Sequence, residues 1–208
     1  MKPLFIVLEG IDKAGKSTQA ELLKTYLINQ GNSAIISSEP TDGVIGKLIR
    51  EAMQSQSISI KKQAKFDEQM AYLFAADRHY HLYNDVDGVY KLIQQDNSHV
   101  IATRYYFSSL AYNCNNQEEF DFVYGLNQRF PNPDLVIYID IALDVALFRL
   151  YNYSYLEVYE TEEKLKQVRE NYHKIFQNYD GEMLKLDGQN TIESIQQEII
   201  TYLEKNFI

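Results

Sequence analysis

Near its amino terminus the chain reads Gly10-Ile11-Asp12-Lys13-Ala14-Gly15-Lys16-Ser17, which fits the pattern G-x-x-x-x-G-K-[ST] at every fixed position. Glycines in such a loop let backbone N–H groups turn inward, where they can surround phosphate oxygens. An apolar run over residues 4–8 precedes the loop, and an amphipathic stretch begins at Ser17. The setting is therefore strand, loop and helix, as the pattern requires. The sequence predicts a loop that binds the phosphates of ATP or GTP.

Two side chains at the end of this loop have expected tasks. We expect the Lys16 ammonium to reach the β- and γ-phosphates and the Ser17 hydroxyl to be a ligand of Mg²⁺. The alternative, a chance glycine turn before a helix, fits poorly because both spacing and context agree with the pattern. The residues expected to contact the nucleotide are Gly10, Ile11, Asp12, Lys13, Ala14, Gly15, Lys16, Ser17 and Thr18.

The composition argues against several other classes of protein. The 208 residues include 20 Lys and Arg but 29 Asp and Glu, so the formal net charge is −9. A dedicated nucleic-acid binder needs a basic face, although a local basic group can still hold a small anion. A single cysteine, Cys114, and four histidines favour neither an internal disulfide nor a zinc site. The start of the chain does not resemble a secretory signal, and residues 4–8 are too short to span a bilayer. We therefore expect a cytoplasmic protein without membrane contact.

Short apolar runs alternate with longer amphipathic stretches along the chain. Several runs are continuous, as expected for strands that are buried on both faces of a sheet. Strands separated by helices predict β-α-β units around a parallel sheet. We expect an α/β protein with the P-loop NTPase fold, in which a five-stranded parallel sheet is flanked by helices in one domain over residues 1–208. The apolar runs are residues 4–8, 34–36, 100–102, 135–139 and 183–186.

Two amphipathic stretches carry clear helix signals. Residues 17–30 have apolar side chains at helical spacing and end before Gly31, and residues 191–207 begin at Thr191, a suitable N-cap. The segment around residues 150–166 is rich in Tyr and Glu but has weaker periodicity. We expect a short lid there, with an irregular helix pair as the alternative.

Several segments together resemble the thymidylate kinase family, in an order and spacing that are specific. The resemblance runs from about residue 5 to about residue 190. It implies that the γ-phosphoryl group of ATP is transferred to dTMP, giving dTDP and ADP, with Mg²⁺ as the metal and a homodimer built by helix packing. The segments are residues 9–19, 39–43, 46, 48–50, 73–78, 104–112, 133–135 and 146–149.

The acceptor site is expected on two helical stripes. Phe74 and Arg78 are four residues apart and share one helix face. The resemblance implies that Phe74 stacks on the pyrimidine and that Arg78 donates to a base carbonyl. The alternative is core packing for Phe74 and a solvated or ion-paired Arg78. Arg104, Ser108 and Tyr112 form a second stripe. The resemblance implies that Arg104 bridges the donor and acceptor phosphates and that Ser108 lines the site. It also implies that Tyr112 disfavours a 2′-hydroxyl, although simple packing remains open for this residue.

The resemblance also assigns roles to polar residues around the loop. It implies that Asp12 holds the sugar 3′-hydroxyl and that Lys13 stabilises the migrating phosphoryl group, although a solvent-facing charge is the alternative for Lys13. Arg149 is expected on the nucleotide. The expected catalytic residues are Lys16, Arg104, Lys13 and Asp12. The expected contacts of the acceptor are Asp12, Glu39, Pro40, Arg50, Phe74, Arg78, Arg104, Ser108 and Tyr112.

Three positions depart from the family pattern, and each removes charge near the phosphoryl group. Thr103 replaces an aspartate that helps to organise Mg²⁺, which leaves Glu9 and Glu39 as candidates for that support. Val158 replaces an arginine of the lid. Ser38 precedes Glu39, where the family often has a basic residue that binds the acceptor phosphate. We therefore expect Arg50 or Arg78 to bind that phosphate instead.

Two alternatives to a monophosphate kinase stay open at this point. The first is a deoxynucleoside kinase, whose hydroxyl acceptor needs a base, and Glu39 is the candidate. The second is a catalytically weak nucleotide-binding homologue, which the departures at Thr103 and Val158 favour. The sequence also leaves open the preference among dTMP, dUMP and other monophosphates.

Overall fold

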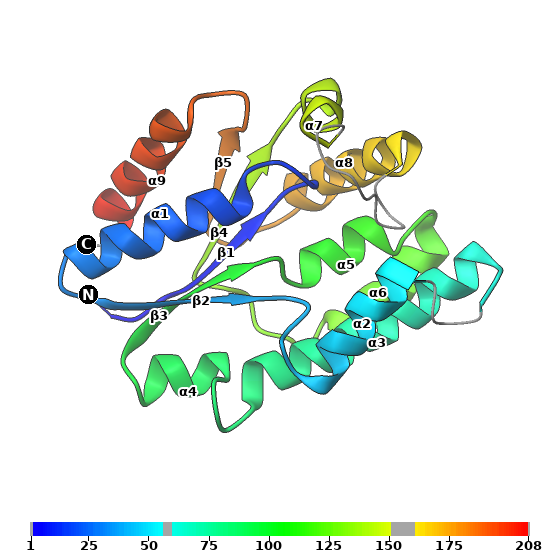
Figure 1. Cartoon of the computed structure of the whole chain (residues 1–208), viewed down its shortest axis with the longest axis horizontal. Helices are drawn as coiled ribbons and strands as arrows, with labels where there is room; N and C mark the ends of the chain where they lie inside the picture. The colour runs from blue at the N-terminus through cyan, green and yellow to red at the C-terminus, as the bar shows by residue number, and fades with distance from the viewer. Residues whose placement is uncertain (1, 56–59, 151–160, 208) are drawn as a thin grey trace.

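The computed structural model describes residues 2–55, 60–150 and 161–207. Most of the predicted lid, including Val158, lies outside these residues. Among the described residues, each strand is followed by one to three helices (Figure 1). None of these helices is both long and apolar enough to cross a membrane.

The strands form one parallel sheet in the order β2-β3-β1-β4-β5. Each predicted apolar run matches one strand, with only Leu4 lying outside its strand, so the predicted five-stranded parallel sheet is confirmed. The strands extend beyond the runs because polar residues at their ends also join the ladder. Their bounds are β1 (Phe5–Glu9), β2 (Ser33–Ser38), β3 (Ser98–Thr103), β4 (Leu135–Asp140) and β5 (Met183–Asp187).

The helices flank the sheet on two sides. In Figure 1, α1 and α9 lie together on one side, and α4 lies on the other, below β3. On that second side α5 also packs against α8 and α3. The bounds are α1 (Lys16–Asn29), α2 (Val44–Ser55), α3 (Gln63–Tyr83), α4 (Val89–Gln94), α5 (Tyr106–Tyr112), α6 (Gln117–Asn127), α7 (Leu143–Leu150), α8 (Glu162–Gln177) and α9 (Ile192–Asn206).

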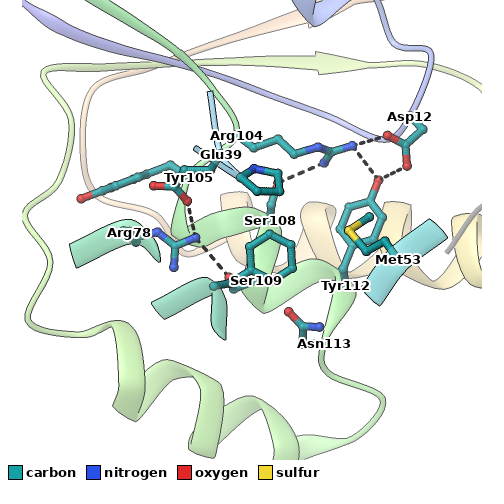
Figure 2. Close-up of a pocket in the computed structure, with 12 residues that line it drawn as sticks. Asp12, Glu39, Met53, Arg78, Arg104, Tyr105, Ser108, Ser109, Tyr112 and Asn113 are labelled. Carbon is teal, nitrogen blue, oxygen red and sulfur yellow. Dashed lines mark hydrogen bonds and ion pairs between the residues drawn. The ribbon is translucent and has the colours of Figure 1, made fainter. Parts of the chain in front are cut away.

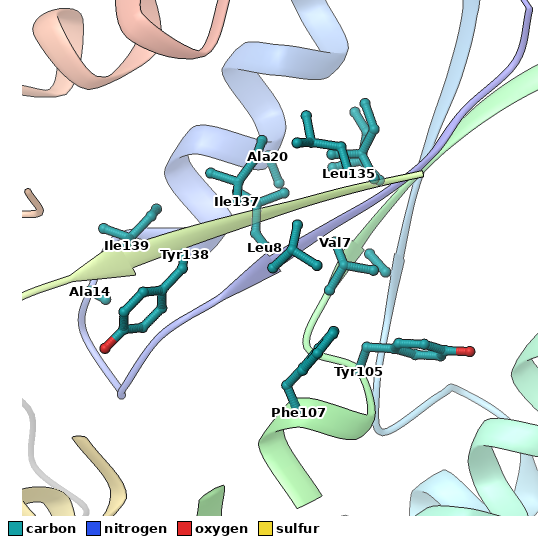
Figure 3. Packing of buried hydrophobic residues seen from close by; sticks show 14 of the residues in the cluster. Val7, Leu8, Ala14, Ala20, Tyr105, Phe107, Leu135, Ile137, Tyr138 and Ile139 are labelled. Atoms are coloured by element: carbon teal, nitrogen blue, oxygen red, sulfur yellow. The ribbon is translucent and has the colours of Figure 1, made fainter. Parts of the chain in front are cut away.

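The core lies on both faces of the central strands. Every residue of β1 is buried, which explains why its sequence is continuously apolar up to Glu9. Figure 3 shows that Val7 points towards Tyr105 and Phe107, whereas Ile137 points to the opposite face, towards Ala20 of α1. The sheet therefore packs between two layers of helices.

The two helices with clear sequence signals form close to the predicted bounds. Helix α1 begins and ends one residue earlier than predicted, and Gly31 beyond it has a φ of 80°. A glycine adopts this left-handed conformation without steric cost. The Thr191 side chain caps α9 by accepting a hydrogen bond from the Ser194 N–H, at 3.2 Å.

The parallel sheet brings three chain segments to one edge. Leu8 of β1 pairs in register with Thr103 of β3, and Thr103 pairs in turn with Ser38 of β2. Because the strands are parallel, the segments that follow them leave the sheet at the same edge. The phosphate loop, Glu39 and Arg104 therefore meet there.

Candidate active site

The loop after β1 has a backbone that only glycine can form at its start. Gly10 has a φ of +145°, and a Cβ atom there would lie 2.5 Å from the carbonyl oxygen of Ile139. Gly15, with a φ of 101°, precedes the first turn of α1. The loop thus runs against β4 and has the left-handed glycine conformations that a phosphate-binding loop uses to turn its N–H groups inward.

The Lys16 side chain folds back over the loop. Its Nζ atom donates hydrogen bonds to the carbonyl oxygens of Gly10, at 2.9 Å, and Ile11, at 2.8 Å. Burial and the nearby Arg104 guanidinium lower the pKa of Lys16 to about 7, although Asp12 and Glu9 oppose the shift. A triphosphate would supply the negative charge that this ammonium lacks.

A groove of about 770 Å³ runs along the loop and the start of α1. Arg149 of α7 fixes one side of it, donating to the carbonyl oxygens of Lys13, at 3.0 Å, and Gly188, at 3.2 Å. Gly10 and Ile11 do not line the groove but accept from Lys16. We call this the donor groove. Its predicted nucleotide contacts are Asp12, Lys13, Ala14, Gly15, Lys16, Ser17, Thr18 and Arg149.

A second cavity, of about 130 Å³, lies beside the donor groove (Figure 2). Its volume is comparable with that of cavities that hold one benzene-sized ring. We call it the acceptor pocket, because it gathers the predicted acceptor contacts apart from Arg50. Its lining residues are Asp12, Glu39, Pro40, Met53, Phe74, Arg78, Arg104, Tyr105, Ser108, Ser109, Tyr112 and Asn113.

Arg104, Asp12 and Tyr112 form a cluster between the two cavities. The Arg104 guanidinium makes an ion pair with Asp12 and lies 4.8 Å above the Tyr112 ring. The Tyr112 hydroxyl donates to Asp12 at 2.8 Å. Figure 2 shows these three side chains converging. Arg104 has a φ of 74°, which is unusual for a non-glycine residue and directs the guanidinium back towards the loop.

Charge keeps both members of this ion pair ionised. Burial alone would raise the pKa of Asp12, but the positive charges of Arg104 and Lys16 and the Tyr112 hydrogen bond hold it below its usual value. Burial likewise disfavours the Arg104 cation, yet the charge of Asp12 raises its pKa well above the usual value. The cluster therefore carries one fixed positive and one fixed negative charge at neutral pH.

Glu9 lies at the end of β1 with its carboxylate fully buried. It accepts hydrogen bonds from the Tyr105 N–H at 2.7 Å, the Ser108 hydroxyl at 2.8 Å and the Tyr172 hydroxyl at 2.8 Å. Burial raises the pKa of Glu9, although Arg104 and these hydrogen bonds oppose the rise. Its oxygens are thus engaged with protein groups rather than directed to a metal.

Arg78 is held in a buried polar network beside the acceptor pocket. Its Nη2 atom donates to Glu39 at 2.6 Å and to the Ser109 hydroxyl at 3.2 Å, and its Nη1 atom donates to Asn127. The Tyr105 ring lies 5.4 Å from the guanidinium. The Nε atom of Arg78 has no hydrogen-bond partner among the described residues.

Arg50 and Thr103 lie differently from the other predicted site residues. Arg50 donates to the carbonyl oxygen of Pro40 at 2.8 Å and pairs with Asp42 at 3.1 Å, so its guanidinium is outside the acceptor pocket. The Thr103 hydroxyl lies 2.7 Å from the Ser38 hydroxyl. Two of the three departures from the family pattern therefore contact each other.

The described residues contain no group of three or more His, Cys, Asp or Glu side chains that could hold a metal ion. Mg²⁺ needs no such cage, since it binds through one or two protein oxygens, water and substrate phosphates. Ser17 is exposed in the first turn of α1 and lines the donor groove. The residues present thus fit a magnesium ion carried in with a triphosphate.

Sequence reasoning missed several residues that position the site. Tyr172 of α8 contacts Glu9 and Ser108, while Asn127 of α6 contacts Arg78. Both come from helices that carry no site motif, and the one available signal is a polar group on an otherwise apolar helix face. Met53 of α2 and Asn113, the residue that follows α5, also line the pocket and were not predicted, although each lies close to a predicted segment.

Comparisons with known proteins agree with this geometry. The family model for thymidylate kinase matches residues 8–199. A probable thymidylate kinase from Thermococcus gammatolerans is 36% identical, over 99% of this chain and 98% of the relative. One from Methanosphaera stadtmanae is 36% identical, over 94% of this chain and 95% of the relative. The solved structure of thymidylate kinase from Candida albicans has the same fold, with a TM-score of 0.79 and 23% identity over 99% of this chain and 92% of that one. The chain belongs to the thymidylate kinase family.

Proposed function

We propose that this protein transfers the γ-phosphoryl group of ATP to dTMP, giving dTDP and ADP. The observation that carries this proposal is the junction of the two cavities. Asp12, Glu39 and Arg104 line both the donor groove and the acceptor pocket. A triphosphate tail in the groove and a nucleotide monophosphate in the pocket would therefore meet at Arg104, where the phosphoryl group is to be passed.

On the donor side, catalysis is positioning and electrostatic stabilisation. The loop N–H groups and Lys16 surround the β- and γ-phosphates, and Arg104 reaches the γ-phosphate from the acceptor side. Lys13 adds a further positive charge beside the groove. Arg149, which already bridges the loop and the β5–α9 connection, holds the nucleoside end.

Mg²⁺ is the metal that we propose for this reaction. Ser17 would hold it together with the phosphate oxygens, and Thr103, which also lines the groove, would contact its water ligands. When bound, the ion neutralises charge that develops on the transferred phosphoryl group. Glu9 and Glu39 are engaged with protein partners and are not proposed as ligands.

On the acceptor side, Phe74 and Arg78 are proposed to read the base. Phe74 supplies a pocket wall for stacking, and Arg78, which lines the same pocket, would donate to a base carbonyl through its guanidinium. The Tyr112 ring and Asp12, which are joined by a hydrogen bond, would contact the sugar of the acceptor. A phosphate dianion is already a nucleophile at neutral pH, so this acceptor needs no general base.

The deoxynucleoside kinase alternative is not favoured. It needs Glu39 as a base, but Arg78 donates to one oxygen of this carboxylate at 2.6 Å and His81 lies 3.0 Å from the other. A carboxylate held by two donors has little freedom to take a proton from a sugar hydroxyl. The alternative of a catalytically weak nucleotide-binding homologue is tested by measuring turnover.

An acceptor panel at fixed ATP and Mg²⁺ tests the function directly. ADP release would be followed with dTMP, dUMP, other nucleoside monophosphates and thymidine as acceptors. We expect turnover with dTMP and none with thymidine. Turnover with thymidine alone would establish the nucleoside kinase, and ATP binding without turnover for any acceptor would establish the inert homologue.

We also propose a homodimer that uses the outer face of α3. Tyr72, Tyr80 and Tyr83 are 48%, 42% and 47% exposed, and their spacings of eight and three residues place them along one side of the helix. Exposed aromatic stripes of this kind commonly mark interfaces. Light scattering of the wild-type protein and of a Tyr72→Ser, Tyr83→Ser double variant tests it, because only the variant is expected to be monomeric. A single domain over residues 1–208 and a cytoplasmic location stay predictions.

A further inference from the structure

Glu39 is held from two sides inside the protein. Its Oε2 atom accepts from Arg78 at 2.6 Å, and its Oε1 atom lies 3.0 Å from Nδ1 of His81. The side chains of Arg78, Glu39 and His81 are each only 1–2% exposed. Apart from the two cavities that Glu39 lines, its carboxylate is therefore shielded from bulk water.

His81 is itself held by a serine on the edge strand. Its Nε2 atom lies 2.6 Å from the Ser37 hydroxyl. Since an ionised Glu39 can only accept, Nδ1 of His81 must carry the hydrogen in this pair. The contacts thus form one line from Ser37 of β2 through His81 and Glu39 to Arg78, which lines the acceptor pocket.

We infer that His81 is a positioning residue for the acceptor base. It acts through Glu39, whose carboxylate orients the Arg78 guanidinium at the base end of the acceptor pocket. This inference rests on the proposed function, because Arg78 is the group proposed to read the base. His81 itself lies outside the pocket-lining residues and touches no substrate there.

The geometry distinguishes positioning from simple filling of space. An apolar side chain of similar size at position 81 would leave Oε1 of Glu39 buried and without a partner. The carboxylate would then turn towards the remaining donor and draw the Arg78 guanidinium with it. The base end of the pocket would lose its alignment. The donor groove would change less, because Glu39 is one of its lining residues but Arg78 and His81 are not.

Two amide substitutions provide a matched test. In His81→Asn the amide nitrogen occupies the δ position and can still donate to Glu39. In His81→Gln the amide lies at the ε position, near Ser37, and cannot reach Glu39 in the same way. Both variants bury a neutral amide, so a merely structural role of His81 would affect them alike. The His81→Leu variant removes both contacts.

Calorimetric affinity for dTMP and for thymidine, and KM for ATP, are the measurements. We expect His81→Asn to bind dTMP within about threefold of wild type, and His81→Gln and His81→Leu to bind it about tenfold more weakly. Thymidine should weaken by the same factor, because the effect lies at the base, and KM for ATP should stay within about twofold.

The outcomes separate this inference from the proposed function. Equal dTMP affinity for the Asn and Gln variants, with both folded by thermal melting, overturns the positioning role. An equal change in KM for ATP also overturns it. Wild-type protein that binds dTMP without turnover overturns the proposed function alone, whereas wild-type protein that does not bind dTMP overturns both.

Discussion

The Arg104 guanidinium and the Asp12 carboxylate are paired at the point where the donor groove opens into the acceptor pocket. The pair brings together the segment after β3 and the loop after β1, which are 92 residues apart. A phosphate entering from either side would meet a cation whose charge is partly balanced by Asp12. Arg104 can therefore bind the phosphoryl group more tightly in the transition state, when negative charge moves towards the guanidinium.

The first prediction concerns the guanidinium of Arg104. We expect Arg104→Met to lower kcat by about 10³-fold, because an arginine on a transferring phosphoryl group has effects of that order. Arg104→Lys should lose less, about 10²-fold, because a point charge remains but the planar fork is gone. Steady-state kinetics with dTMP measures both, and ATP affinity by calorimetry should change little. A Met variant with kcat within threefold of wild type would contradict the assigned role.

The second prediction concerns proton uptake by Lys16. With a pKa of about 7 in the free protein, Lys16 is mostly neutral at pH 8. The negative charge of bound triphosphate favours the ammonium and raises this pKa, so binding of ATP at pH 8 should take up close to one proton. Calorimetry in two buffers with different ionisation enthalpies measures the uptake.

The same titration at pH 6 is the control for Lys16. There the side chain is already protonated before ATP binds, so uptake should fall towards zero. Equal uptake at pH 6 and pH 8 would show that another group is responsible. In Lys16→Met, ATP affinity should fall by at least about tenfold, because the ammonium that meets the phosphates is missing.

The third prediction compares two glycines. Gly10→Ala should destabilise the protein by about 2 kcal/mol or more, since the new Cβ atom would meet a backbone oxygen at 2.5 Å and φ is +145°. Gly125→Ala should stabilise it by about 0.5–1 kcal/mol, because this exposed position in α6 has no atom within 4 Å of the added Cβ. Chemical denaturation measures both, and a neutral Gly10→Ala would refute the close approach of the loop to β4.

The fourth prediction concerns Tyr172, the hydroxyl that reaches Glu9 from α8. Tyr172→Phe should cost about 1–3 kcal/mol of unfolding free energy, because Glu9 is fully buried and loses one of its donors. Tyr26→Phe is the matched control: it removes a hydroxyl that bonds Glu204 at 2.9 Å on the surface, so its effect should be below about 0.5 kcal/mol. Similar losses in the two variants would count against the Glu9 network.

The sheet was predictable because each of its strands contains a run of mainly apolar residues. Residues 135–139 lie inside β4, and residues 4–8 overlap β1 at all but one position. The edge strand β2 was predicted too short, at residues 34–36, because its serines join the ladder to β3 without being apolar. A hydrophobic pattern predicts which residues are buried. It does not predict which residues join a β-ladder, because that depends on backbone partners elsewhere in the chain.

The site was predictable where sequence spacing controls geometry. The loop depends on local turns, and Ser108 and Tyr112 share one face of α5, so their neighbours in space are near neighbours in sequence. The prediction of a single helical stripe was wrong for Arg104, which precedes α5 with a φ of 74° and reaches Ser108 through its long side chain instead. Tyr172, Asn127 and His81 reach the site only through the packing of separate helices. A local sequence pattern does not predict which side chains are brought together by the packing of separate helices.

All strands of the sheet run the same way, and this has a practical consequence for labelling. The segments that carry the nucleotide contacts leave the carboxyl edge, whereas β1 enters at the opposite edge and α9 returns the chain to it, as the N and C marks in Figure 1 show. A fluorescent protein or affinity tag fused at either end would project away from both cavities. Such fusions should keep full turnover and can report on this kinase during catalysis.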